Sequence, residues 1–196
     1  DMLKIGVGPS SSHTLGPWRA AEKFLNELRK RNLFDNVNSI QVDLYGSLSL
    51  TGKGHATDLA LMLGLSGADP EYIPIESIDV IITAIKNKKE IYLGNEMIIP
   101  FCYETDIVFN RNFLPFHANG LIFTAKTDTE TFSETYYSIG GGFVVKEGEE
   151  DKTDEITKTF PFPIEKADEL LAFCKAENKS ISEIVYENEK TLRSEE

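Results

Sequence analysis

Cysteine is scarce in this sequence, which has two cysteines, Cys102 and Cys174, among its 196 residues. They lie far apart and share no Cys-x-x-Cys spacing, which argues against a secreted disulfide framework and against a zinc site. An iron–sulfur cluster of the [4Fe-4S] type takes about four cysteine thiolates. We therefore predict that this chain holds no metal and no other cofactor by itself.

Long hydrophobic runs are absent as well, and positive charge is in the minority. No stretch approaches the roughly 20 apolar residues that cross a bilayer, and residues 1–5 lack the long apolar core of a signal peptide. The formal net charge is −12, so the field of the chain repels nucleic-acid phosphates and anionic membrane surfaces. We expect a cytoplasmic protein with no nucleic-acid partner and no membrane partner.

The patterns that are present indicate an α+β fold. Pro17 suits the first position of a helix, and apolar residues then recur three or four apart from Trp18 to Leu28. A period of two over residues 40–44 predicts a strand. Further helices are predicted at residues 56–64, 75–86, 165–176 and 182–193, and further strands at residues 97–101, 107–110, 121–126 and 135–145. The expected architecture is a mixed or antiparallel sheet with helices packed on it, followed by a C-terminal helical linker segment.

A run of charge divides the sequence. Residues 147–158 contain almost no apolar side chains, which is the composition of an exposed loop. The sequence therefore predicts one domain at residues 1–146, an exposed linker at 147–163 and a helical segment at 164–196. This last segment is expected to pack on another surface and to lead to a further domain.

Hydroxyl groups crowd the segment that leads into the first helix, residues 5–17 (IGVGPSSSHTLGP). Helix N-termini present free N–H groups and partial positive charge, so the hydroxyls between Ser10 and Thr14 could hold a carboxylate there. The alternative is that they only cap and turn the chain. We do not expect Ser12 and His13 to form a nucleophilic pair, because sequence neighbours seldom share the hydrogen-bond geometry that such a pair needs.

A second unusual segment covers residues 45–58 (YGSLSLTGKGHATD). Gly52 and Gly54 would allow the backbone to approach a ligand closely. We expect a loop over residues 51–55, which places His55 at the junction with the next helix.

The spacing in this segment excludes a phosphate-binding P-loop, because Lys53 is followed by Gly54 and not by Ser or Thr. A Schiff-base role for Lys53 is a weaker interpretation than an ordinary surface lysine, since no other cofactor signal accompanies it. The helix that follows is expected to be capped by Thr57 or Asp58.

Two further segments combine turn residues with unusual neighbours. Residues 114–120 (LPFHANG) place His117 just before an Asn-Gly turn. Residues 136–143 (YYSIGGGF) interrupt an apolar strand with three glycines, which is costly unless the backbone kinks or another surface comes close. The alternatives are a solvated loop histidine and a simple β-bulge.

All three histidines of the chain, His13, His55 and His117, fall inside these unusual segments. The reference pKa of imidazole, about 6.5, suits proton exchange near neutral pH, so a site that needs a general base could use any of them. Chemistry alone does not choose among the three.

Taken together, in this order and spacing, the four segments resemble the β domain of the iron–sulfur L-serine dehydratases, also called L-serine ammonia-lyases. Residues 160–192 resemble the segment that joins the β and α domains in members with both on one polypeptide. In that family the α domain carries the cysteines that hold a [4Fe-4S] cluster. The resemblance implies that this chain is part of an enzyme that deaminates L-serine to pyruvate and ammonia, and that it is inactive alone.

The resemblance also implies the residues of the site, with His55 of the GKGH sequence as the expected base. The predicted catalytic residues are His55, His13 and His117, and the predicted substrate-binding residues are Ser10, Ser11, Ser12, Thr14 and Gly54. The expected partners are L-serine, a second copy in a homodimer, and the catalytic α domain on the same polypeptide or as a separate subunit. The alternative is a regulatory L-serine-binding or dimerisation module with no direct catalytic residue.

Overall fold

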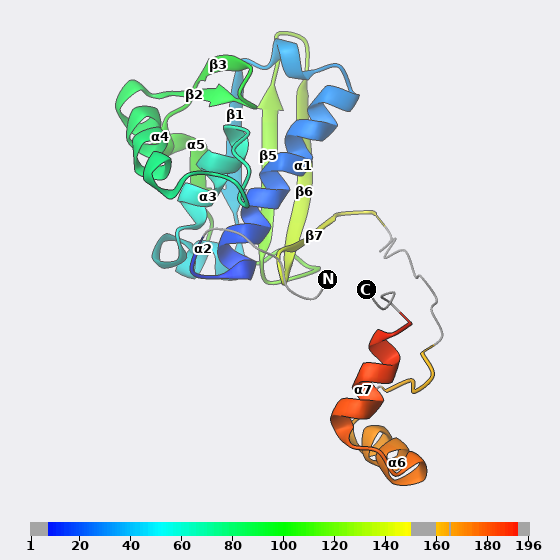
Figure 1. Ribbon diagram of the computed structural model, residues 1–196. Helices are drawn as coiled ribbons and strands as arrows, with labels where there is room; N and C mark the ends of the chain where they lie inside the picture. Colours follow the sequence, from blue (N-terminus) through cyan, green and yellow to red (C-terminus); the bar gives the residue numbers. More distant parts are fainter. Residues whose placement is uncertain (1–7, 150–159, 165, 192–196) are drawn as a thin grey trace. The chain divides into compact units, whose positions relative to one another are not determined.

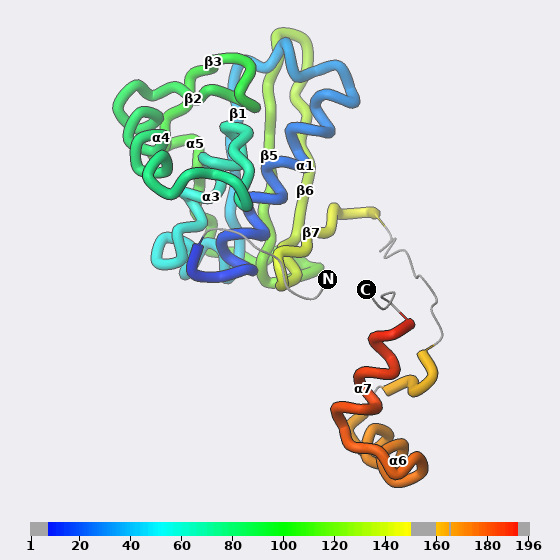
Figure 2. The backbone as a smooth tube through the Cα atoms, in the orientation of Figure 1, coloured from blue at the N-terminus to red at the C-terminus, as the bar shows by residue number. Residues whose placement is uncertain are grey.

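A five-stranded sheet organises the larger of the two units of the chain, residues 1–149 (Figures 1 and 2). The computed structural model describes residues 8–149, 160–164 and 166–191. The strands, in their order across the sheet, are β4 (Ile107–Phe109), β1 (Ser39–Leu44), β5 (Gly120–Lys126), β6 (Thr131–Gly140) and β7 (Phe143–Lys146). β1 pairs in parallel with β4, and every other neighbouring pair in this sheet is antiparallel. The mixed sheet and its helices confirm the predicted α+β class.

α1 (Gly16–Lys30) covers one face of the sheet, and Figure 1 shows it crossing in front of β5 and β6. Its predicted apolar face, from Trp18 to Leu28, is buried. Phe24 on the same face stacks on Phe123 of β5, with ring centroids 5.0 Å apart. α3 (Thr57–Leu65) packs beside α1 and is buried along almost its whole length. Burial of this apolar area stabilises the fold and fixes the N-terminal ends of both helices, which begin three residues after His13 and two residues after His55.

A helix and a two-stranded hairpin form the remaining part of this unit. These elements are α4 (Ile75–Lys88), β2 (Glu90–Leu93), β3 (Met97–Pro100) and the short α5 (Tyr103–Asp106). β2 is not among the predicted strands, because four residues are too few to show a period. The strand forms by antiparallel pairing with β3.

Two local predictions are wrong. Residues 51–55 do not form a loop, because α2 (Gly46–Thr51) continues into a 3₁₀-helix, η3 (Gly52–His55). Residues 135–145 do not form one strand, because Gly141 and Gly142, both with positive φ, turn the chain between β6 and β7. Gly140 also has positive φ but ends β6, where it pairs with Phe143 after a shift of register that begins at Ser138. Glycine adopts such angles without the steric cost that a side chain brings, so two glycines form the hairpin turn and the third lies at an irregularity of the strand.

The second unit contains two helices, α6 (Ala167–Glu177) and α7 (Ile181–Glu189). Ser180 and Glu183 form a reciprocal capping box at the start of α7. Asn188 of α7 binds both the N–H and the carbonyl of Phe162. Most of the predicted linker, residues 150–159, lies outside the described residues. The same holds for residues 165, 192 and 193 of the predicted helices. The predicted boundary at residues 147–163 therefore stays a prediction.

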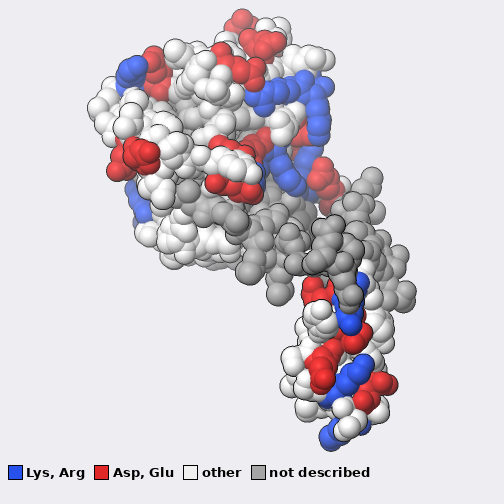
Figure 3. Space-filling model, in the orientation of Figure 1, with Lys and Arg blue, Asp and Glu red and all other residues white. Residues whose placement is uncertain are grey.

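The charges of both units are visible in Figure 3, where acidic side chains are interspersed with basic ones. The lower end of the larger unit, around α2, shows few charged side chains in this view. Among the residues that the structure describes, no helix has the length and apolar character needed to cross a membrane.

Candidate functional site

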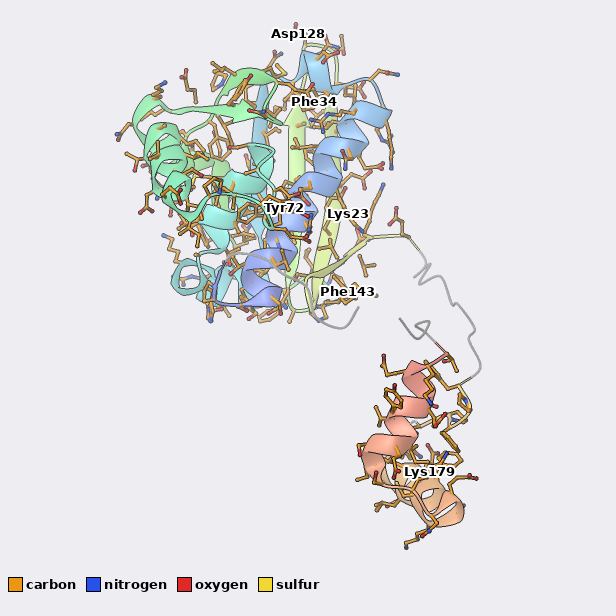
Figure 4. All side chains as sticks on the ribbon, in the orientation of Figure 1. Lys23, Phe34, Tyr72, Asp128, Phe143 and Lys179 are labelled. Atoms are coloured by element: carbon orange, nitrogen blue, oxygen red, sulfur yellow. The ribbon has the colours of Figure 1, made fainter. Side chains whose placement is uncertain are left out.

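The four unusual segments meet at one end of the sheet. β1 runs antiparallel to β5, and β5 runs antiparallel to β6. The same end of the sheet therefore holds the C-terminal end of β1, the start of β5 and the C-terminal end of β6. α1 also begins at this end. In Figure 4 this is the end that carries Phe143, and Asp128 marks the opposite end.

Backbone hydrogen bonds join the segment of His117 to its neighbours. The N–H of Ser47 in α2 donates to the carbonyl of Ala118 at 2.8 Å. The N–H of Ser138 in β6 donates to the carbonyl of Asn119 at 3.0 Å, and the Asn119 side-chain amide donates back to the Ser138 carbonyl at 3.1 Å. Because Asn119 and Ser138 are both buried, these bonds hold the segment firmly against the sheet.

His13 lies in a short π-helix, η1 (Ser11–Leu15), in which the N–H of Gly16 donates to the carbonyl of Ser11. Such turns are rare and occur frequently at functional sites. The Ser10 hydroxyl accepts from the N–H of His13 at 3.4 Å and so caps this turn. One alternative for the hydroxyls between Ser10 and Thr14 was that they only cap and turn the chain. Ser10 has this capping role.

Both ring nitrogens of His13 contact hydroxyl groups. Nδ1 lies 2.9 Å from the Oγ of Ser12, and Nε2 lies 2.9 Å from the Oγ of Ser47. The expectation that Ser12 and His13 do not share hydrogen-bond geometry is wrong, because the π-helical turn brings their side chains together. In a neutral imidazole one of these nitrogens donates and the other accepts, so the two serines set the orientation of the ring.

The two ring nitrogens of His55 differ in their contacts with the described residues. Its Nδ1 lies 2.9 Å from the carbonyl oxygen of Thr51. A carbonyl can only accept, so Nδ1 carries the proton and Nε2 carries the lone pair of the neutral ring. Within residues 8–149, the structure shows no hydrogen bond to this Nε2. His55 is thus held in the tautomer that a general base requires.

The backbone next to His55 is strained. Ala56 has φ 57° and ψ 31°, in the left-handed region that residues with a side chain seldom adopt. Such residues cost about 1–3 kcal/mol and cluster at functional sites. Ala56 connects η3, which contains His55, to α3. Its conformation therefore sets the orientation of η3 and His55 relative to α3.

The rings of His13 and His55 lie together, with centroids 5.1 Å apart and planes inclined by 42°. Burial lowers the pKa of the His13 imidazole below its usual value, and the charge of the neighbouring His55 lowers it further. Two positive imidazolium groups at this separation repel each other, so a charge on His55 opposes a charge on His13.

We expect the stability of this chain to depend on pH through His13. Because its pKa is lowered on folding, the folded state binds fewer protons than the unfolded state at pH values just below about 6.5. The free energy of unfolding should therefore rise with pH through this window and gain nothing more from His13 above it. Urea unfolding of the wild type and of His13→Gln between about pH 5 and 7 measures the difference. Equal slopes for the two proteins would contradict the lowered pKa.

His117 has the opposite arrangement of its ring protons. Its Nδ1 accepts from the N–H of Asn119 at 3.1 Å, so the neutral ring carries its proton on Nε2. Among the described residues, His117 makes no hydrogen bond or ring contact with His13 or His55. The structure therefore brings two of the three predicted histidines into contact and places the third on the adjoining segment.

The predicted substrate-binding residues differ in their surroundings. Ser11 and Gly54 are exposed, and Ser10 and Ser12 are half-buried. Thr14 is buried, and its hydroxyl donates to the carbonyl of His55 at 2.9 Å. Lys53, weighed as a Schiff-base lysine, extends over the ring of Phe109 with Nζ 4.9 Å from the centroid.

Three side chains of the site were not singled out in the sequence, namely Ser47, Thr51 and Ser138, and Thr57 was singled out only as a helix cap. The prediction that Thr57 or Asp58 caps α3 is wrong, because the N-cap position is Ala56 and has no side-chain cap. The Thr57 hydroxyl instead donates to the carbonyl of His13, and Asp58 accepts from the hydroxyl of Tyr103. Ser47 and Thr57 lie inside the second segment, so its concentration of hydroxyl groups was the available signal.

The described part of the chain contains no set of side chains suited to bind a metal ion. Cys102 belongs to the larger unit and Cys174 to the second unit, and both are free thiols. Within residues 8–149, 160–164 and 166–191, no group of three His, Cys, Asp or Glu side chains could hold a metal ion. These residues do not fit a [4Fe-4S] cluster, and we assign no chemical step of this chain to one.

Comparison with known proteins gives consistent matches. The family described as "Serine dehydratase beta chain" matches residues 1–149. The chain is 41% identical over 199 residues to the L-serine dehydratase of Haemophilus influenzae, covering 100% of this chain and 44% of that protein. It is 41% identical to L-serine dehydratase 1 of Escherichia coli, covering 99% and 43%. It is 42% identical to the L-serine dehydratase of Streptomyces coelicolor, covering 100% and 44%. The chain thus spans less than half the length of these relatives.

Proposed function

Because this chain belongs to the serine dehydratase beta chain family, we propose that it is the β part of an enzyme that converts L-serine to pyruvate and ammonia. The observation that carries this proposal is the histidine pair. The Nδ1–H of His55 is bonded to a carbonyl, and its Nε2, which makes no hydrogen bond within residues 8–149, carries the lone pair next to a second imidazole. The catalytic part is the remainder that the longer relatives contain.

His55 acts as the general base in this proposal. Loss of water from L-serine requires removal of the proton on Cα and departure of the hydroxyl on Cβ. The proton on Cα moves to Nε2 of His55, and the electron pair of the Cα–H bond forms the Cα–Cβ double bond of an aminoacrylate. The Cβ–O bond breaks with its electron pair on oxygen, and the departing hydroxide takes up one proton and leaves as water. The aminoacrylate then becomes an imine, and water hydrolyses the imine to pyruvate and ammonia.

His13 and His117 have supporting roles. Both nitrogens of His13 already contact hydroxyl groups, which makes it a poorer base than His55. When His13 is neutral, no positive charge lies beside His55 to oppose its uptake of a proton. His117 presents an Nε2–H in its neutral form, so it can donate a hydrogen bond or a proton, whereas His55 accepts one.

The serine-rich turn is proposed to bind the substrate carboxylate. Ser11 and Ser12 lie at the N-terminal end of the helical segment that leads into α1, where the backbone favours negative charge. Gly54, beside His55, would let a ligand approach the backbone. Thr14, whose hydroxyl is already bonded to the His55 carbonyl, acts on the substrate only through that histidine.

Four exposed apolar side chains lie on or next to three of the four unusual segments. They are Leu50, Phe113, Phe116 and Ile139. A patch of this kind beside a polar site is typical of a surface that another protein part covers. We propose that the catalytic α domain covers it, on the same polypeptide or as a separate subunit. The resemblance assigns the [4Fe-4S] cluster to that domain, and a cytoplasmic location and a homodimer belong to the same proposal.

The test joins this chain to the C-terminal part of one of the longer relatives. We expect the joined protein, prepared without oxygen and supplied with iron and sulfide, to form pyruvate from L-serine, and the 196-residue chain alone to form none. A folded, cluster-containing joined protein without activity would overturn the proposal. Calorimetric titration of the chain alone with L-serine tests the regulatory alternative, which requires binding without the catalytic domain.

A further inference from the structure

Two threonines connect the segments of His13 and His55 in a crossed pattern. The hydroxyl of Thr14, the residue after His13, donates to the carbonyl of His55 at 2.9 Å. The hydroxyl of Thr57, two residues after His55, donates to the carbonyl of His13 at 2.5 Å. Each histidine backbone is therefore held by a side chain from the segment of the other histidine, although 41 and 44 residues separate the bonded partners.

These hydroxyls lie in the interior, whereas the two imidazoles reach the surface. Thr14 is 4% exposed and Thr57 is 0% exposed, and His13 and His55 are half-buried. Opening either bond would leave a buried threonine hydroxyl without its partner, so both bonds resist opening. In a regular helix the His13 carbonyl would accept from residue 17, but that residue is Pro17 and has no N–H. Thr57 supplies a donor to this carbonyl.

A third buried hydroxyl anchors the same turn to the sheet. Ser138 of β6 donates to the carbonyl of Ser12 at 2.7 Å. Its Oγ occupies the space beside Gly16, where an added Cβ would lie 1.9 Å away. The turn that carries His13 is thus fixed on one side to the sheet and on the other to the segment of His55.

We propose that Thr14 and Thr57 form a reciprocal latch that sets the separation of the two imidazoles, with Thr57 as a positioning residue for His13 and Thr14 as one for His55. Neither threonine is required to touch the substrate. The catalytic consequence rests on the proposed function, whereas the geometry of the latch can be tested in the chain itself.

The first experiment follows the two imidazoles by NMR in the 196-residue chain with Thr57→Val, which keeps the shape of the side chain and removes the hydroxyl. We expect the His13 pKa to move up toward its usual value and the contacts between the two rings to weaken. Thr57→Ser keeps the hydroxyl and should restore both. Ser66→Ala is the matched control, since it removes a hydroxyl-to-carbonyl bond of 2.7 Å at the opposite end of α3.

Activity provides the second readout, in the chain joined to its catalytic part. A displacement of about 1 Å at a catalytic group can cost 10²-fold, so Thr57→Val should lower kcat by about this factor with a much smaller change in KM. Unchanged titration of both histidines together with unchanged kcat would overturn the latch, even if the variant were less stable.

If Thr57→Val fails to fold, Thr14→Val tests the other half of the latch, with Thr14→Ser as its rescue. Here the disturbance should centre on His55, and an undisturbed His55 would contradict the proposal. An inactive joined wild type with the expected NMR changes in the variants would overturn the proposed function and leave the latch standing.

Discussion

Replacement of His55 by glutamine in the chain joined to its catalytic part is expected to lower kcat by about 10²–10⁴-fold, the usual contribution of a general base. Glutamine can still donate a hydrogen bond to the carbonyl of Thr51, but it has no lone pair of comparable basicity at the position of Nε2. Exchange of the L-serine α-proton with solvent, followed by NMR, should fall with kcat, because this step needs the base directly.

The matched comparison is His117→Gln, which removes an imidazole that makes no ring contact with the pair within the described residues. Its effect on exchange of the α-proton should be much smaller than that of His55→Gln. Both variants should unfold within about 0.5 kcal/mol of the wild type, since the two histidines are only half-buried. Near-normal turnover in a folded His55→Gln enzyme would remove His55 from the role of base.

Replacement of Gly46 by alanine is expected to destabilise the chain by about 3 kcal/mol or more. Gly46 has φ +56°, and a Cβ added there would lie 2.2 Å from the carbonyl oxygen of Ala118. That oxygen is held in place, because it accepts a hydrogen bond from Ser47 at 2.8 Å. Equilibrium unfolding in urea measures the loss. The same displacement should separate Ser47 from His13, so the NMR signals of His13 should change in any folded fraction.

Gly54→Ala is the control for this prediction, because it makes the same chemical change eight positions further along. Gly54 is absent from the residues with positive φ, and nothing lies within 4 Å of an added Cβ. Its free energy of unfolding should remain within about 0.5 kcal/mol of the wild type. Equal losses in the two variants would mean that the close approach at Gly46 is unimportant. Reduced activity of a fully stable Gly54→Ala protein in the joined enzyme would support a ligand or partner surface at this glycine.

The pattern of the sequence was sufficient for the long elements of the fold. The apolar period from Trp18 to Leu28 predicts α1, and the alternation over residues 40–44 predicts β1. Such predictions succeed because one face of each element must be buried, and the spacing of that face is a local property of the chain. The composition of the four unusual segments also directed attention to the three histidines, and the resemblance that these segments carry agrees with the family match.

The short elements and the contacts within the site required the tertiary structure. Residues 46–55 contain three glycines, so the local sequence does not determine their conformation. The helix α2 begins at Gly46, whose backbone lies close to the carbonyl of Ala118 in the neighbouring segment. The crossed bonds of Thr14 and Thr57 join residues more than 40 positions apart, and no periodic pattern encodes such a pairing. The sequence by itself determined which residues could exchange protons. Only the packing of α1 and α3 against each other and on the sheet decided that His13 and His55 stand side by side, because that proximity depends on the position of whole elements.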